Sequence, residues 1–286
     1  METGSYGDVR WYLAHNMLPP PDSVRVEELV NAFAYAYAPP RPGDGAPLSG
    51  SVEAAGCPWA PTHRLVRIGL KAMEVGGTPV ASAAEVPVVP VSQTTETPAT
   101  VATDVNVQVE FNPAVVSAYR LIGFENAVAL ADEFAGNAYS GEFGAGRAVT
   151  ALYEVIPVGA PDAAATPRPR ANALRYQKPA TVPADVRGEM LTVKVRYREP
   201  GERVSRLLEF PVTDGGASYA GASEDFKFAA AVASFGMILR GSPHRGTATL
   251  SSVAELAQQG VGPDEDGPRA DFLVLVQRAR ALSGGR

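Results

Sequence analysis

The chain has 286 residues, of which 45% are hydrophobic and 20% are charged, a composition typical of a globular protein with one large or two ordinary domains. Its net charge is −6, and lysines and arginines are scattered singly, which argues against nucleic-acid or anionic-membrane binding. The single cysteine, Cys57, excludes an internal disulfide, and no apolar run reaches the roughly 20 residues that span a bilayer.

The first quarter of the chain predicts two helices followed by two strands. Residues 5–33 carry two short amphipathic patterns that the proline run 19–21 divides. After a Pro/Gly-rich turn, residues 49–55 and 63–73 are strand candidates. The second of these alternates Val66 and Ile68 with Arg67 and Lys71, which predicts a half-buried strand.

The middle of the chain predicts β structure interrupted by two loose stretches. Residues 75–103 are rich in Gly, Ala, Ser, Thr, Val and Pro, and we interpret them as a disordered linker. Strand candidates follow, and a Pro/Ala-rich stretch at 161–183 separates them from two alternating runs joined by a Pro-Gly turn, which indicate a β-hairpin. The strands are expected at 104–111, 118–124, 147–158, 189–198 and 203–212.

The last quarter predicts three packing helices. Ser223 is the expected N-cap of the first, whose apolar stripe is Phe228, Val232, Phe235 and Leu239. The second has a candidate capping box of Ser252 with Glu255 and ends at Gly260. The third begins at Pro268. Its expected buried residues are Phe272, Leu275, Val276, Ala279 and Leu282.

Candidate chemical groups are few. His15, His63 and His244 are too scattered for a metal cluster. Cys57 and His63 lie close in sequence, but a nucleophilic site also needs an orienting third group and an oxyanion hole. We therefore interpret Cys57 as a small packed hydrophobe.

Two loop motifs also have structural explanations. The glycines of residues 141–146 precede a strand rather than a helix, so they indicate a turn and not a phosphate loop. Residues 264–267 resemble the opening of a calcium loop, yet Pro268 and Leu275 occupy positions that need oxygen ligands, so we interpret them as the acidic approach to the last helix. The sequence thus assigns no catalytic, cofactor-binding or metal-binding residue and predicts a protein that is not an enzyme.

Several long runs resemble the YfbK-type bacterial von Willebrand factor A domain proteins. The runs SYGDVRWYL, LPPPDSVRVEELVNAF and CPWAPTHRLVRIGLKA resemble that family's N-terminal region. The runs VQVEFNPAVVSAYRLIGFENA, GAGRAVTALYEVIPV, LTVKVRYREP, SEDFKFAAAVASFGMILRGSP and RADFLVLVQRARAL are similar to its C-terminal region. Together these matches cover nearly all of the chain outside the two loose stretches.

The resemblance implies a domain between the two regions that this chain does not contain. In the family they flank a Rossmann-like von Willebrand factor A domain, whose D-x-S-x-S loop holds a divalent cation that recognises acidic ligands. That domain would fall between Met73 and Asp104, where only the linker stands, and D-x-S-x-S occurs nowhere in the chain. The resemblance therefore implies that the cation-dependent site is missing.

The expected fold is α+β. It is a composite antiparallel β-sandwich-like body built from the N- and C-terminal regions, with two short N-terminal helices, about three C-terminal helices and no Rossmann-like module. An inserted domain usually enters and leaves its host at neighbouring points, so residues 1–74 and 104–286 are expected to pack as one domain around the linker 75–103. The family also has a further segment and an export or lipid-anchor signal upstream of the position of Met1, which implies a late start.

The leading functional hypothesis is a non-catalytic scaffold that binds a protein partner. The resemblance suggests the bacterial cell envelope, although the start of the chain carries no export signal. One alternative is a truncated or decayed gene product that folds but binds nothing specific. A remote alternative is a hydrolase that uses Cys57 and His63.

Overall fold

A computed structural model describes residues 4–41, 43, 45–75, 99–123, 137–161 and 188–284. The helices are α1 (Gly4–Ala14), α2 (Val26–Asn31), α3 (Glu224–Arg240), α4 (Leu250–Gln259) and α5 (Pro268–Leu282). The strands are β1 (Leu48–Cys57), β2 (Ala60–Ala72), β3 (Thr100–Phe111), β4 (Val116–Leu121), β5 (Asn137–Gly144), β6 (Ala148–Pro157), β7 (Glu189–Arg198) and β8 (Arg206–Thr213).

The strands form two four-stranded sheets, and every pairing in the described residues is antiparallel. The first, sheet A, has the order β1-β2-β6-β4, and the second, sheet B, has the order β5-β3-β7-β8. Strand β2 pairs directly with β6, with Arg64 opposite Val155 and Lys71 opposite Ala148. The N-terminal and C-terminal regions therefore share one sheet, and the predicted α+β composite body is confirmed.

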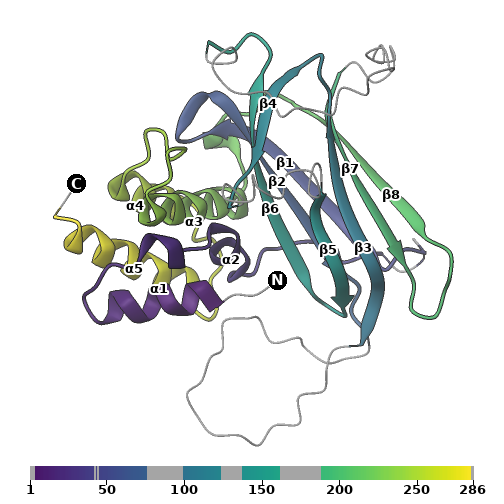
Figure 1. Ribbon diagram of the computed structural model, residues 1–286, viewed down its shortest axis with the longest axis horizontal. Coiled ribbons are helices and arrows are strands. Elements are labelled where there is room, and N and C mark those ends of the chain that lie inside the picture. Colours follow the sequence, from purple (N-terminus) through teal and green to yellow (C-terminus); the bar gives the residue numbers. More distant parts are fainter. Residues whose placement is uncertain are drawn as a thin grey trace, which may run out of the picture.

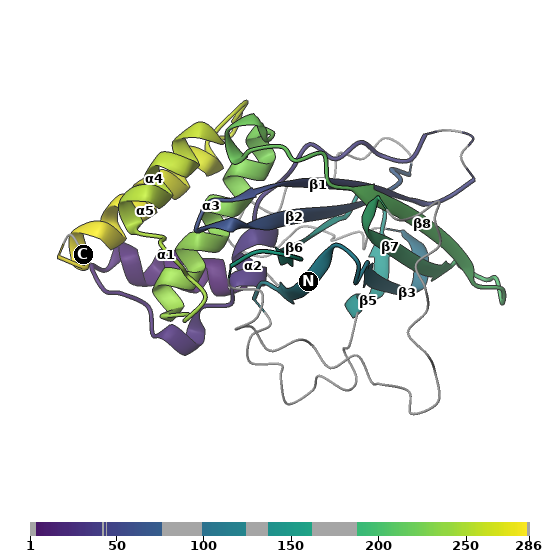
Figure 2. The ribbon, with the colours of Figure 1, turned by 90° about the horizontal axis from the view of Figure 1, so that it is seen from above.

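Two hydrophobic cores lie on the two faces of sheet A. Between the sheets, Val66, Ile68 and Leu70 of β2 pack in the same cluster as Val107 of β3 and Val193 of β7. On the opposite face, sheet A packs against the helices, so the molecule has three layers in the order helices, sheet A, sheet B (Figures 1 and 2). The outer face of sheet B points away from the helices (Figure 2).

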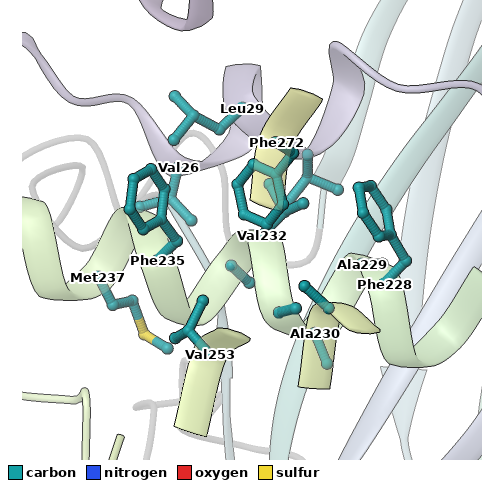
Figure 3. Close-up of a cluster of buried hydrophobic side chains, with 14 of the residues drawn as sticks. Val26, Leu29, Phe228, Ala229, Ala230, Val232, Phe235, Met237, Val253 and Phe272 are labelled. Carbon is teal, nitrogen blue, oxygen red and sulfur yellow. The ribbon is translucent and has the colours of Figure 1, made fainter. Parts of the chain in front are cut away.

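Helix α3 forms the centre of the helical layer. Its buried residues include Phe226 and every residue from Phe228 to Met237, so the predicted stripe with Leu239 was too narrow. The wider burial arises because α2, α4, α5 and sheet A surround the helix (Figure 3). Phe228, Phe235 and Phe33 all make edge-to-face contacts with Phe272 of α5, at ring-centroid distances of 5.3 to 5.6 Å.

Strand β2 corrects a second expectation. Its side chains from Leu65 to Leu70 are buried on both faces, whereas the alternation predicted a half-buried strand. The helical layer and Tyr37 cover the face that carries Arg67. Arg67 is thus a buried charge in the interior of the molecule, with 6% of its surface exposed.

Element boundaries were mostly predicted well. The hairpin of β7 and β8, the two N-terminal helices, the N-cap Ser223 and the start of α5 at Pro268 are confirmed. Strand β3 begins at Thr100, not at Asp104, and β5 was missed. Residues 76–98, 124–136 and 162–187, which include most of the predicted linker and of the second loose stretch, lie outside the described residues.

The N-terminus of α4 differs from the prediction. Thr249 is the N-cap, and its side chain accepts a hydrogen bond from the backbone N–H of Ser252. In return, the hydroxyl of Ser252 accepts a hydrogen bond from the backbone N–H of Thr249. Ser252 is therefore the third residue of the helix and not its N-cap. Gly260 ends the helix as predicted.

Candidate functional site

The two sides of the undescribed segment 76–98 are held at neighbouring points. The backbone N–H of Gly146 donates to the carbonyl of Met73 at 2.9 Å, and that of Ala145 donates to the carbonyl of Ala99 at 2.8 Å. Ala145 and Gly146 are consecutive residues of the turn between β5 and β6. We call Met73, Ala99 and turn residues 144–147 the junction. At the junction the chain leaves sheet A after β2 and enters sheet B at β3, and the N–H groups of two adjacent residues bind the carbonyls on its two sides.

The turn of the junction is itself firmly held. Lys71 Nζ donates to the carbonyl of Gly146 at 2.8 Å, and Ala72 N donates to the carbonyl of Arg147 at 2.8 Å. Gly146 has a φ of 69°, in the left-handed region that favours glycine. The predicted turn in residues 141–146 is confirmed for Ala145 and Gly146, whereas residues 141–144 belong to β5.

A buried carboxylate, Glu154 of β6, gathers polar groups from several elements. It accepts hydrogen bonds from Trp59 Nε1 at 2.9 Å and from Arg120 Nε and Nη2 at 3.0 and 2.5 Å. It also pairs with His63 Nδ1. Arg120 Nη2 reaches the carbonyl of His244, in the loop after α3, at 3.3 Å. We call Trp59, His63, Arg120 and Glu154 the Glu154 cluster.

The Glu154 cluster keeps its carboxylate charged. Burial alone would raise the pKa of Glu154, but the charge of Arg120 and the hydrogen bonds from Trp59 and His63 outweigh it, so the pKa is lowered. A carboxylate with a lowered pKa is a weak proton acceptor. Because its partners come from the β1–β2 hairpin and β4, the carboxylate ties three strands of sheet A together and, through Arg120, joins them to the helical layer.

Cys57 lies near this cluster in the protein interior. It is 4% exposed and belongs to the core between sheet A and the helices, as the prediction of a packed hydrophobe expected. Burial and, after it, the charge of Glu154 raise the pKa of the Cys57 thiol. A protonated buried thiol is a poor nucleophile. The His63 ring nitrogen Nδ1 is engaged with Glu154.

The remaining motifs occupy structural positions. Among the described residues, no three or more His, Cys, Asp or Glu side chains are grouped closely enough to hold a metal ion. The His15 ring lies against that of Trp11, with ring centroids 4.3 Å apart and the planes tilted by 33°. Asp264 accepts from the backbone N–H groups of Arg269 and Ala270, so the acidic approach to the last helix caps α5. Within the described residues, no helix has the length and apolar character needed to cross a membrane.

A second buried charge network was missed from the sequence. Asp225, in the first turn of α3, accepts from Arg269 of α5 at 2.5 Å and from the backbone N–H of Ala36 at 2.6 Å. Arg67 of β2 lies 3.6 Å from the same carboxylate. These residues are far apart in sequence and share no spacing motif, so no local signal marked them.

Two family models match the chain, one on each side of residues 68–95. A family model described as the C-terminal region of the uncharacterized protein YfbK matches residues 96–282. The chain belongs to this YfbK family. A model described as von Willebrand factor matches residues 1–67, whose described part forms α1, α2, β1 and most of β2. The predicted resemblance is confirmed.

The YfbK relative is much longer than the matched region. The uncharacterized protein YfbK of Escherichia coli (strain K12) is 35% identical over 186 residues, which are 64% of this chain and 31% of the relative. The match thus spans about a third of the relative's length. The first family model ends at residue 67 and the second begins at residue 96, so nearly all of the segment 76–98 lies between the two matches.

Proposed function

We propose that this chain is a non-catalytic protein-interaction scaffold of the bacterial cell envelope, whose junction is built to carry an inserted domain. The observation that carries the proposal is the pair of hydrogen bonds from Ala145 and Gly146 to Ala99 and Met73. Domain insertion is tolerated best where the host chain leaves and returns at neighbouring points. The resemblance to the von Willebrand factor A domain proteins names one domain that relatives carry in this place.

The internal ties of the body support a scaffold role. The Glu154 cluster joins strands of sheet A to the loop after α3, and Asp225 joins α3 to α5 and to Ala36. These charged groups bond to one another in the interior, where charge pairs hold elements in register. They give a rigid body on which an inserted domain would have a fixed orientation, because both of its ends would be anchored to one turn.

The insertion experiment replaces residues 76–98 with a small folded domain whose termini lie close together. We expect the variant to unfold within about 5 °C of the parent, because the contacts of the described residues are kept and a longer connection between two fixed points adds little closure entropy. The matched control places the same domain between Val107 and Gln108, inside β3, and is expected not to fold. Loss of the folded body in both variants would refute the junction as an insertion point.

The interaction half of the proposal needs a separate measurement. The chain is used as bait in a bacterial envelope extract, in parallel with a double variant, Arg278→Glu and Arg280→Glu, at two exposed positions of α5. A scaffold that presents its C-terminal helices should retain a protein that the variant loses. Recovery of nothing above background from the parent chain would instead favour a decayed gene product.

A further inference from the structure

The outer face of sheet B carries a polar hollow. Val107 of β3 and Val193 of β7 face the core. Because side chains alternate along a strand, their neighbours in each strand point to the outer face of sheet B. That face lies away from the helical layer (Figure 2). A hollow of about 420 Å³ opens on it. We call it the sheet B hollow, and its lining residues are Asn106, Gln108, Glu110, Lys194, Arg196 and Leu207.

Most cations on or near this face are neutralised by carboxylates of the same face. Lys194 Nζ bonds to Glu110 at 2.8 Å and lies 3.6 Å from Glu209. The hydrogen bond to Glu110 raises the pKa of Lys194, so its ammonium group stays charged and engaged. At the ends of the strands, Arg198 pairs with Asp104 and Arg206 with Glu199.

Arg196 differs from its neighbours. It is exposed, and among the described residues no carboxylate pairs with it. It lies opposite Asn106 of β3 on one side and opposite Leu207 of β8 on the other. The centre of the hollow thus offers a guanidinium group with uncommitted N–H donors, beside an amide and a half-exposed aliphatic side chain.

This arrangement fits one carboxylate rather than a run of them. A guanidinium binds a carboxylate through two parallel hydrogen bonds. Lys194, two residues before Arg196 on the same face of β7, is already paired with Glu110 and Glu209. A second negative charge placed there would be repelled by these two carboxylates. A ligand is therefore expected to carry its single negative charge over Arg196 and neutral polar groups over Gln108.

The apolar contacts favour a peptide over an acidic sugar. Leu207 is 49% exposed and can pack against an aliphatic side chain. The lining residues include no aromatic ring on which a sugar could stack. We propose that the sheet B hollow binds an extended peptide segment through one Asp or Glu carboxylate placed on Arg196. This rests on the proposed role as an interaction scaffold and names the chemistry of a partner for a surface other than the C-terminal helices.

The test is a titration of the isotope-labelled full chain with two synthetic peptides, acetyl-Gly-Ser-Leu-Asp-Ser-Gly-amide and the same peptide with Asn in place of Asp. We expect saturable amide chemical-shift changes at Asn106, Arg196 and Leu207 with the Asp peptide only. Arg196→Gln should weaken binding about tenfold or more, whereas Arg196→Lys should keep part of it, because a lysine supplies the charge without the two-bond geometry.

The matched control is Arg203→Gln, which removes the same charge from the exposed turn between β7 and β8 and should leave binding unchanged. Equal binding of both peptides, or unchanged binding by Arg196→Gln, would overturn the proposal. So would tri-galacturonic acid producing the same shifts while the Asp peptide produces none, because the ligand would then be an acidic sugar. Insertion at the junction does not involve the hollow, so failure of this titration is distinct from failure of the junction experiment.

Discussion

Gly69 of β2 lies directly against the ring of Tyr37: a Cβ atom at Gly69 would be 2.2 Å from two carbons of that ring. Tyr37 in turn shares a hydrogen bond of 2.8 Å with the hydroxyl of Thr150 on β6, and its ring faces the guanidinium of Arg67. The absence of a side chain at Gly69 therefore lets the segment after α2 lie on sheet A.

Gly69→Ala should destabilise the protein by about 3 kcal/mol, because the added methyl group displaces Tyr37 from Thr150 and Arg67. Urea unfolding measures the change. The matched control is Gly7→Ala in α1, where nothing lies within 4 Å of the added atom and a small gain of up to about 1 kcal/mol is expected. Equal effects of the two substitutions would show that Tyr37 is not held as described.

Glu154→Gln should lower the free energy of unfolding and make it less dependent on pH in the acid range. The folded-state pKa of Glu154 lies below its ordinary value of 4.5, so the ionised group stabilises the fold above that pH. This stability is lost as the pH falls through the lower folded-state pKa. At pH 7 we expect a loss of about 3 kcal/mol, because the substitution removes the buried carboxylate charge that pairs with Arg120. The free energy of unfolding, measured in urea between about pH 3 and 7, should depend less steeply on pH in the variant than in the parent.

Glu110→Gln provides the comparison for Glu154. Its pair with Lys194 lies on the surface, with the Glu110 side chain 50% exposed, and surface pairs contribute less than about 1 kcal/mol. A Glu154→Gln variant as mildly affected as Glu110→Gln, with an unchanged pH slope, would contradict the assignment of Glu154 as the charged centre of its cluster.

Thr249→Ala should cost about 1 kcal/mol, because it removes the hydrogen bond to the N–H of Ser252 at the start of α4. Glu255→Ala, which the sequence pattern alone would single out, should have a smaller effect. Thermal unfolding of both variants distinguishes the two assignments. A larger effect at Glu255 would restore the original interpretation of the capping box.

Cys57 should not react with an aromatic disulfide reagent in the native state at pH 8, since the thiol is buried and its pKa is raised. Full reaction should appear only in denaturant. Rapid modification of the native chain would revive the hypothesis of a cysteine-dependent hydrolase with Cys57 and His63.

Features that short stretches of sequence determine were predictable. The alternation on both sides of the Pro-Gly turn identified the β7–β8 hairpin, and Ser223 and Pro268 marked the starts of α3 and α5. Each of these depends on backbone preferences and side-chain hydrogen bonds within a few residues.

Features that depend on distant partners were not predictable. Arg67 alternates with valine and isoleucine, as a solvent-facing residue does. It is buried because Tyr37 and Asp225, which are distant in sequence, pack against it. Strand β5 is rich in glycine and polar residues and pairs with β3 without an apolar pattern of its own. The junction was expected on general grounds, but its anchoring by Ala145 and Gly146 required the pairing of strands from both halves of the chain.

The most direct test of the composite body is to cut the chain within residues 76–98. A protease recognition sequence is placed there, the purified full chain is cleaved, and the products are passed over a size-exclusion column without denaturant. Because β2 is paired with β6, we predict that the two pieces elute together and unfold in one transition close to that of the uncut chain. Separation of the pieces into two independently folded species would contradict the account.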